Sequence, residues 1–243
     1  MDARILGSGG WMPTGTRETT CIYAREGEHV LVVDAGTGFR RLVSEPDLVA
    51  GARRISVVLT HFHIDHLMGL PFLYDLDDVP EREIWAAALA LESIPADALV
   101  HRLVDTPFMP PGAGLPAEVR ELDPAAVEIG PFTLDVRIQR KHPNPTLALR
   151  VNGELAVCTD TEYDQENVAF ARGARVLCHD AFYVSGQQPN HTGAQDAARL
   201  AAEAGVERLV LMHLNPRVDE EALLAAARPI FAATAVGRDG MPL

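Results

Sequence analysis

The chain has 243 residues, 47% of them hydrophobic, and its 34 acidic and 21 basic residues give a formal net charge of −13. This length and hydrophobic content are enough for one large domain or two small ones with a sizeable core. The acidic excess argues against a broad nucleic-acid footprint, which needs lysine and arginine to displace counterions, although bound metals can still attract a small anionic substrate. No apolar run is long enough to span a membrane and the N-terminus has no signal-peptide core, so we expect a cytoplasmic protein. The three cysteines form no CxxC pair, so we expect buried free thiols.

The first part of the chain predicts short strands joined by tight turns. Residues 4–6 form a short apolar strand before a glycine-rich turn. Residues 21–24 and 29–33 predict a hairpin, and residues 39–43 begin a helix. Asp34 directly follows the second hairpin strand. It is either an outer partner of a metal ligand or a cap for the turn or helix that follows.

The next stretch is the most informative one. Residues 55–59 form an apolar run that predicts a buried strand, and His61, His63, Asp65 and His66 follow it. On an extended backbone His61 and His63 project to the same side, whereas Asp65 and His66 lie where the chain must turn. Three imidazoles and one carboxylate suit zinc or a similar divalent ion, and two pairs that point differently suit two adjacent metals better than one. A polar surface loop is the alternative.

The segment after this motif is less regular. Residues 83–86 predict a strand, and the apolar spacing of residues 91–104 predicts a helix. His101 lies within that helical pattern and is interpreted as a surface residue. Residues 106–114 are rich in proline and glycine and form either the rim of an active site or a plain connection, and the sequence alone favours the connection.

The second half of the chain places polar side chains after apolar strands. Strands are predicted at residues 127–129, 132–138, 147–151, 155–158, 175–178 and 208–212. The fourth follows the hairpin signal Asn152-Gly153. Helices are predicted at residues 194–204 and 219–227. Seven of the nine histidines then lie at strand ends or helix starts, a pattern that packing does not explain: His61, His63, His66, His142, His179, His191 and His213.

The series HxHxDH, followed in order by His142, Asp160 and His213, resembles the metallo-β-lactamase superfamily. Within it, the chain most resembles the ribonuclease Z and cyclic-phosphodiester hydrolase branch, which includes phosphoribosyl cyclic phosphodiesterases and class II cyclic-nucleotide phosphodiesterases. Further support comes from the flanking segments at residues 6–10, 34–38, 160–162, 179–181, 191–192 and 209–213. The resemblance implies an α/β fold, a four-layer αββα sandwich, in a single hydrolase domain over residues 1–243.

The resemblance also implies roles for individual residues. One metal is held by His61, His63 and His142. The second is held by Asp65, His66 and His213, and Asp160 bridges the two ions. Zinc is the default in this branch, and manganese or iron occurs elsewhere in the superfamily. His191 matches a histidine that contacts the phosphate and protonates the leaving group, and Asp180 matches the acidic residue that orients it. The chain departs from the family pattern by having His-Thr-Gly at 191–193 in place of His-Ser-Thr, and Asp180 in place of glutamate.

This site predicts hydrolysis of a phosphodiester. Two metals about 3.5–4 Å apart can activate a shared water and clamp phosphodiester oxygens, with Asp65 accepting a hydrogen bond from the nucleophile. His191 beside Asp180 fits a general acid. His142 and Asp160 are only 18 positions apart, which leaves no room for the long basic arm of ribonuclease Z enzymes. We therefore expect a small or cyclic phosphodiester as substrate, no nucleic acid as a partner, and by family resemblance a homodimer.

Two other classes of function remain open on the sequence. The same metal-activated water can hydrolyse a lactone, ester, thioester or lactam. Only His191, Asp180 and the flanking segments favour phosphodiesters over these substrates. The other class is non-hydrolytic, either a redox iron site or a scaffold that keeps its ligands without turnover. The complete ligand set argues against an inactive scaffold.

Overall fold

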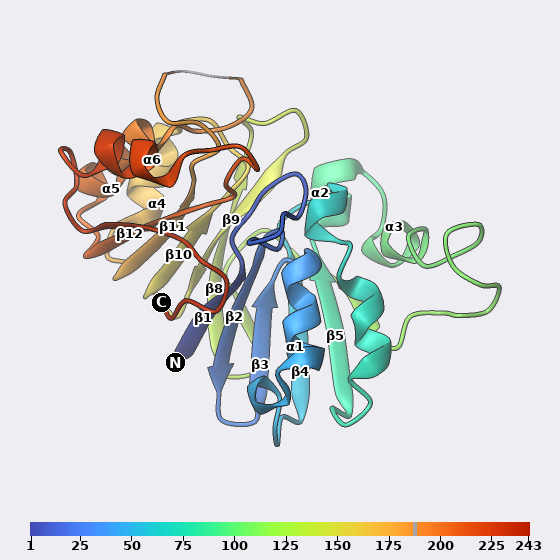
Figure 1. Cartoon of the computed structure of the whole chain (residues 1–243). Helices are drawn as coiled ribbons and strands as arrows, with labels where there is room; N and C mark the ends of the chain where they lie inside the picture. The colour runs from blue at the N-terminus through green and yellow to red at the C-terminus, as the bar shows by residue number, and fades with distance from the viewer. Residues whose placement is uncertain (187–188) are drawn as a thin grey trace.

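The computed structural model describes residues 1–186 and 189–243 as two stacked sheets between two layers of helices (Figure 1). The first sheet has six strands in chain order: β1 (Asp2–Gly7), β2 (Cys21–Glu26), β3 (His29–Val33), β4 (Arg54–Leu59), β5 (Glu81–Ala86) and β6 (Glu118–Glu121). The second sheet has seven strands in the order β13 (Thr234–Val236), β12 (Arg208–Met212), β11 (Val176–Asp180), β10 (Leu155–Cys158), β9 (Thr146–Val151), β8 (Phe132–Gln139) and β7 (Val127–Ile129).

Several strands of each sheet run in the same direction, so the loops that follow their carboxyl ends lie at the same edge of the sheet. In the first sheet, β1–β2 and β2–β3 are antiparallel and β3–β4–β5–β6 are parallel, so β1, β3 and β4 run in the same direction. In the second sheet, β8–β9–β10 are antiparallel and β10–β11–β12 are parallel, so β8, β10, β11 and β12 run together. The carboxyl ends of parallel strands are where open α/β sheets collect their ligands.

The core lies in three layers that explain the sequence patterns. Between the sheets, side chains such as Ile5 and Phe132 pack together, and Leu6, one position after Ile5, faces the helices instead. Each large apolar side chain buried in this way contributes roughly 1.5–3 kcal/mol. Because the central strands are covered on both faces, they read in the sequence as continuous apolar runs.

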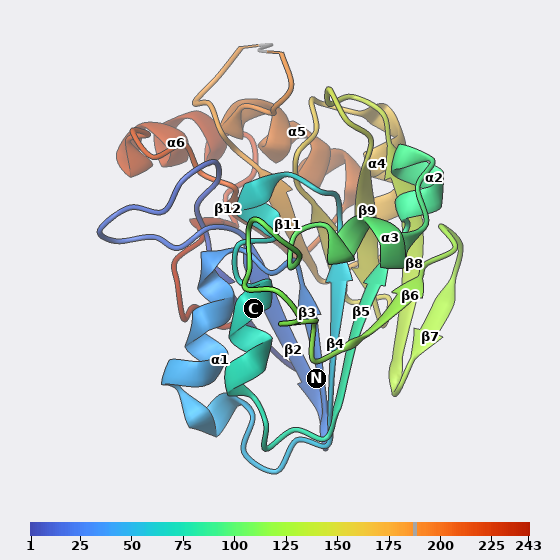
Figure 2. The same ribbon diagram turned by 90° about the vertical axis from the view of Figure 1, so that its right-hand side faces the viewer.

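Helices cover the outer face of each sheet (Figure 2). The first sheet is covered by α1 (Arg41–Ser44), α2 (Ala88–Glu92) and α3 (Ala96–His101), together with 3₁₀ turns at Thr37–Arg40, Pro46–Leu48 and Leu70–Asp75. The second sheet is covered by α4 (Gln165–Ala171), α5 (Ala194–Ala204) and α6 (Glu220–Ala227). The predicted four-layer αββα sandwich is therefore confirmed.

Most predicted elements are found at or near their expected positions. The hairpin at Asn152-Gly153 joins β9 to β10, and both turn residues have positive φ, 50° and 70°, as a tight hairpin turn requires. Helix α5 has the predicted bounds. The prediction of a single helix over residues 91–104 is wrong. Ser93 adopts a left-handed conformation and Pro95 begins a new segment, so the chain forms α2 and α3 instead.

The structure also shows the state of the cysteines and the positions of His101 and His179. The three cysteines are buried and free, as predicted. His101 lies on α3 and pairs with Asp97 at 3.1 Å. His179 does not lie beyond a strand end. It is a buried residue within β11, whose outer face is covered by helices. In the described ranges, no helix has both the length and the apolar character needed to cross a membrane.

Candidate metal centre

The first part of the site is built on the end of β4. His61 comes two residues after the strand, and the backbone of His63 is still extended, with φ −68° and ψ 146°. The chain then forms a 3₁₀ turn over Ile64–His66, which buries the side chains of Asp65 and His66. The change from extended chain to tight turn separates the two pairs of side chains, as the sequence predicted.

The second part of the site comes from strand ends far apart in the sequence. His142 follows β8, Asp160 follows β10 and His213 follows β12. Asp160 and His213 both have left-handed backbones, with φ 53° and 52°. Such conformations cost about 1–3 kcal/mol for residues other than glycine, and the surrounding structure must over-determine them. They end both strands abruptly and turn the chain at the edge of the sheet.

The structure brings all seven expected metal ligands together. Their donor atoms form two groups in which every atom lies within 4.8 Å of the others. One group is His61, His63 and His142, and the other is Asp65, His66 and His213. Asp160 lies between them. Its Oδ1 is 3.8 Å from His61 Nε2 and its Oδ2 is 3.2 Å from His66 Nε2.

The donor atoms at this site fit divalent metal ions. Within the described chain, His61 Nε2 is buried without a hydrogen-bond partner, and His66 Nε2 and Asp160 Oδ2, although 3.2 Å apart, form no hydrogen bond of good geometry. A buried polar atom left without a partner costs roughly 1–3 kcal/mol, so several at one point call for an explanation. Imidazole nitrogens and carboxylate oxygens are the donors that zinc and similar ions prefer, and bound ions would satisfy these atoms.

Outer hydrogen bonds fix the directions of the inner side chains. Asp34 is fully buried and its Oδ2 accepts hydrogen bonds from His66 Nδ1 and from the Thr60 hydroxyl, each at 2.8 Å. With Nδ1 engaged in this way, His66 presents Nε2 to the site. Asp34 therefore holds a candidate metal ligand, which favours the first of the two roles that the sequence left open.

Two further outer partners were missed by sequence reasoning. The backbone N–H of Trp11 donates to Asp65 Oδ2 at 2.7 Å, and the carbonyl of Asn144 lies 3.1 Å from His142 Nδ1. Both contacts use main-chain atoms, which leave no mark on the residue type. The only available signal for Trp11 is its position after the glycine-rich turn that follows β1.

The electrostatics of the cluster follow from burial and close charges. Burial lowers the pKa of His61 well below its usual value. Burial alone would raise the pKa of Asp160, but His213, His66 and His61 hold it well below its usual value. Burial also works against the charged form of His66, yet the neighbouring carboxylates raise its pKa. Asp160 is thus ionised near neutral pH, as a metal ligand must be.

A second pair of side chains lies next to the metal cluster. His191 Nδ1 is 2.8 Å from Asp180 Oδ2, and the ring of Phe182 stacks on the His191 ring at 4.6 Å and 20°. Asp180 also accepts the backbone N–H groups of Phe182 and Thr161, so its carboxylate is fixed. The pair that the sequence predicted is therefore formed, with the imidazole held by a buried carboxylate.

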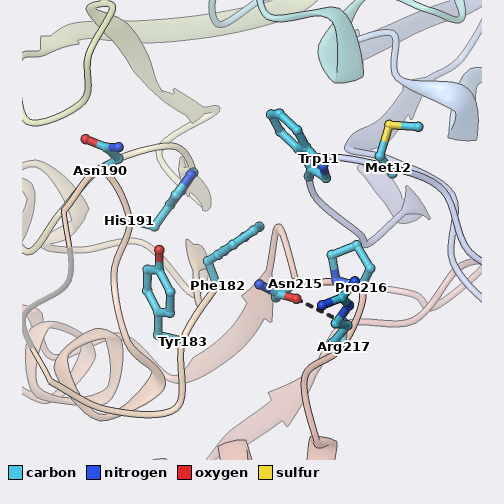
Figure 3. A pocket seen from close by; sticks show the side chains of 9 residues that line it. All are labelled: Trp11, Met12, Phe182, Tyr183, Asn190, His191, Asn215, Pro216 and Arg217. Atoms are coloured by element: carbon cyan, nitrogen blue, oxygen red, sulfur yellow. Dashed lines mark hydrogen bonds between the residues drawn. The ribbon is translucent and has the colours of Figure 1, made fainter.

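Two adjoining cavities open over these side chains. One, of about 280 Å³, is lined by metal-cluster residues and by Trp11, Phe182 and His191. The other, of about 600 Å³, extends away from the cluster (Figure 3). It is lined by Trp11, Met12, Phe182, Tyr183, Asn190, His191, Asn215, Pro216 and Arg217. No residue of the loop 106–114 lines either cavity among the residues described, which agrees with a plain connection.

Comparison with known proteins now identifies the family. A family model described as the beta-lactamase superfamily domain matches residues 29–214. The chain belongs to this superfamily. The matched segment contains every expected metal ligand as well as His191 and Asp180, and the family implies divalent metal ions.

The relatives of this metallo-β-lactamase superfamily member define its branch. It is 27% identical to ribonuclease Z of Methanopyrus kandleri, over 98% of this chain and 95% of the relative. Two solved structures share its fold. The metallo-β-lactamase fold protein YhfI from Bacillus subtilis has a TM-score of 0.82 at 21% identity, covering 100% and 98% of the two chains. Human tRNase Z, short form, has a TM-score of 0.72 at 20% identity, with the same coverage. The chain is a metal-dependent hydrolase of the phosphodiesterase type, in the ribonuclease Z-like branch.

One expectation from the sequence is wrong. We expected a small-molecule substrate and no nucleic acid. The ribonucleases Z that match nearly the whole of this chain are, however, named for an RNA substrate. The net charge of −13 sums over the entire surface, whereas substrate binding depends on the local field, to which divalent ions add positive charge. The short segment between His142 and Asp160 excludes a long arm at that place only.

Proposed function

We propose that this protein is a phosphodiesterase that works with two divalent metal ions. In this proposal His61, His63 and His142 hold one ion, and Asp65, His66 and His213 hold the other. The observation that carries it is the position of Asp160 between the two groups. Its Oδ1 lies 3.8 and 3.9 Å from the Nε2 atoms of His61 and His142 and 3.3 Å from His213 Nε2, and its Oδ2 lies 3.2 Å from His66 Nε2. A carboxylate in this position suits a bridging ligand.

When bound, the ions would lower the pKa of a water molecule and stabilise negative charge on the phosphate oxygens. Zinc suits the mixture of imidazole and carboxylate donors. The chain's own groups do the rest. Asp65 is held by the Trp11 N–H at 2.7 Å and is placed to orient the attacking water. His191 carries the proton for the leaving oxygen. Its Nδ1 is engaged by Asp180, so its Nε2 is the atom that transfers the proton.

The substrate class that we propose is the phosphodiester, the diesters of RNA included. The His191–Asp180 pair supports it, because an alkoxide leaving group needs a proton and an imidazole held by a carboxylate can supply one. The ribonucleases Z among the relatives support the inclusion of RNA.

The test is an activity panel on protein purified without chelator, with metal content measured on the same sample. The panel holds bis(p-nitrophenyl) phosphate, a cyclic nucleotide, a transfer-RNA precursor and a lactone, each with zinc and with manganese. We expect turnover of phosphodiesters and about two ions per chain. A His61→Ala variant prepared in parallel controls for contaminating nucleases and should be inactive. Turnover of the lactone alone would replace the proposal with a carboxylic-ester type of hydrolase, and iron without any hydrolysis would overturn it in favour of redox chemistry.

A further inference from the structure

The larger of the two cavities is lined mostly by side chains that have no part in the proposed hydrolysis, which uses only His191 and the backbone of Trp11. It joins the cavity over the metal cluster through Trp11, Phe182 and His191, which line both. Its volume of about 600 Å³ lies within the range of small-molecule sites, roughly 300–1,000 Å³. The space is therefore open to the part of a substrate that lies next to a scissile bond at the cluster.

One wall is an exposed tryptophan on an anchored backbone. The Trp11 side chain is 67% exposed, although it is among the most costly side chains to leave in water. Its backbone has a left-handed φ of 69°, and its N–H is bonded to Asp65 Oδ2 at 2.7 Å. The indole is thus tied by its own main chain to a carboxylate of the metal cluster. An exposed aromatic ring in a fixed place beside an active site is a platform for stacking.

The opposite wall is also aromatic. Phe182 is held by its N–H, which donates to Asp180 Oδ1 at 3.1 Å, and its ring stacks on His191. Tyr183 packs edge-on against Phe182, with ring centroids 5.3 Å apart and planes at 75°. Figure 3 shows Trp11 on one side of the cavity and Tyr183 on the other, with Phe182 between them.

A cation lies at the edge of this aromatic cavity. Arg217 is exposed, its backbone N–H is bonded to Asn215 Oδ1 at 2.9 Å, and no carboxylate of the described residues lies within ion-pair distance of its guanidinium. A guanidinium is well matched to a phosphate, which it can bind through two parallel hydrogen bonds.

We propose that this cavity is a nucleotide subsite. The base of a nucleotide next to the scissile phosphodiester stacks on Trp11 against the Phe182–Tyr183 wall, and Arg217 binds a second phosphate of the same nucleotide. The proposal rests on the proposed phosphodiesterase function, because it places the scissile bond at the metal cluster. A flat base fits between the aromatic walls formed by Trp11 and by Phe182 and Tyr183. A phosphate fits the guanidinium of Arg217. The nucleotide can belong to an RNA strand or be free, since both present the same base and phosphate.

The first experiment measures binding, which does not depend on turnover. Zinc-loaded protein is titrated with AMP and with ribose 5-phosphate, which lacks the base, in a calorimeter. We expect AMP to bind more tightly. Trp11→Ala should weaken AMP roughly 5- to 150-fold, the range for loss of one stacked base, and leave ribose 5-phosphate unchanged. Trp11→Phe should restore most of the AMP affinity. Phe108→Ala, which removes an aromatic side chain that is 77% exposed elsewhere, is the matched control.

The second experiment tests Arg217 and the source of the nucleotide. Adenosine 3′,5′-bisphosphate should bind more tightly than AMP, and Arg217→Gln should abolish that difference. Arg175→Gln is the control, because Arg175 is also exposed and precedes β11 at the end away from the site. A short single-stranded RNA forms the other arm. RNA that binds more tightly than AMP, and that loses affinity in Trp11→Ala, assigns the subsite to a polymer, and RNA that binds no more tightly than AMP assigns it to a free nucleotide.

The outcomes separate this proposal from the proposed function. Equal affinity of AMP and ribose 5-phosphate, or an AMP affinity unchanged by Trp11→Ala, overturns the nucleotide subsite even if phosphodiesters are hydrolysed. Base-dependent binding that is lost in Trp11→Ala supports the subsite even if the activity panel shows no turnover. Equal loss of AMP and ribose 5-phosphate binding in Trp11→Ala would show an effect that does not depend on the base, and it would overturn the stacking role of Trp11.

Discussion

The two sheets contribute to the candidate site in different ways. The first sheet supplies four polar side chains from one short stretch, residues 61–66, directly after β4. The second sheet supplies single side chains from four separate strand ends: His142, Asp160, Asp180 and His213. The first contribution is encoded locally, whereas the second exists only because β8, β10, β11 and β12 run in the same direction in one sheet. Metal ligands can thus be recognised in one segment, while the side chains that join and complete the site depend on the fold.

This difference has a consequence for mutations. Substitution of a first-sheet residue that hydrogen-bonds to a proposed ligand, such as Asp34, should lower the affinity for the ion held by that ligand. Changes at the second sheet's strand ends should disturb both ions, through Asp160, or the proton transfer, through His191 and Asp180.

The largest effect is expected for Asp160→Asn, which removes the bridging charge. Loss of an outer partner costs roughly 10–100-fold in metal affinity, so loss of a shared ligand should cost more than that at both sites. Metal analysis should show less than one ion per chain, and turnover should fall with it. Asp135→Asn is the matched control, because Asp135 pairs with Arg150 at 2.8 Å on another part of the second sheet. Two ions retained in Asp160→Asn would contradict the bridging role.

The next effect separates proton transfer from metal binding. His191→Ala should lower kcat roughly 10²–10⁴-fold for a phosphodiester with an alkyl leaving group, because the alkoxide must be protonated. The loss should be far smaller with p-nitrophenolate, which leaves without a proton. Metal content should stay the same. His191 also lies within 4.8 Å of His142 and Asp160, so loss of an ion in this variant would make it a ligand instead.

The sequence predicted the locally encoded part of the site far better than the rest. The spacing of His61, His63, Asp65 and His66 follows from strand and turn geometry alone. The contact between the Trp11 N–H and Asp65 spans 54 positions and uses a backbone atom, so residue types do not reveal it. The same limit applies to the fold, where alternation and turn residues predicted most strands. The helix expected over residues 91–104 failed because periodicity was given more weight than the proline within it.

A smaller effect, confined to the first sheet, is expected for Asp34→Asn. The amide keeps the shape of the side chain and tolerates the left-handed backbone of Asp34, φ 61°, but it removes the charge that His66 Nδ1 faces at 2.8 Å. Affinity for one of the two ions should fall roughly 10–100-fold, and the other ion should stay. Competition with a chelator, followed by metal analysis, measures the two affinities. Equal weakening of both ions would break the proposed division between the sheets.

The smallest effect tests how closely the two sheets approach at the site. Gly10 N donates to the carbonyl of Leu214, and a Cβ added at Gly10 would lie 2.5 Å from the ring of His213, closer than real atoms come. Gly10→Ala should therefore push the His213 imidazole from its place. It should lower the affinity for one ion roughly tenfold, the lower end of what misorientation of a ligand costs. Gly15→Ala, in the same loop with nothing within 4 Å of the added atom, is the control and should bind both ions normally. An unaffected Gly10→Ala protein would mean that His213 can move without leaving the metal. The second sheet would then hold its ligand less rigidly than the left-handed backbone of His213 implies.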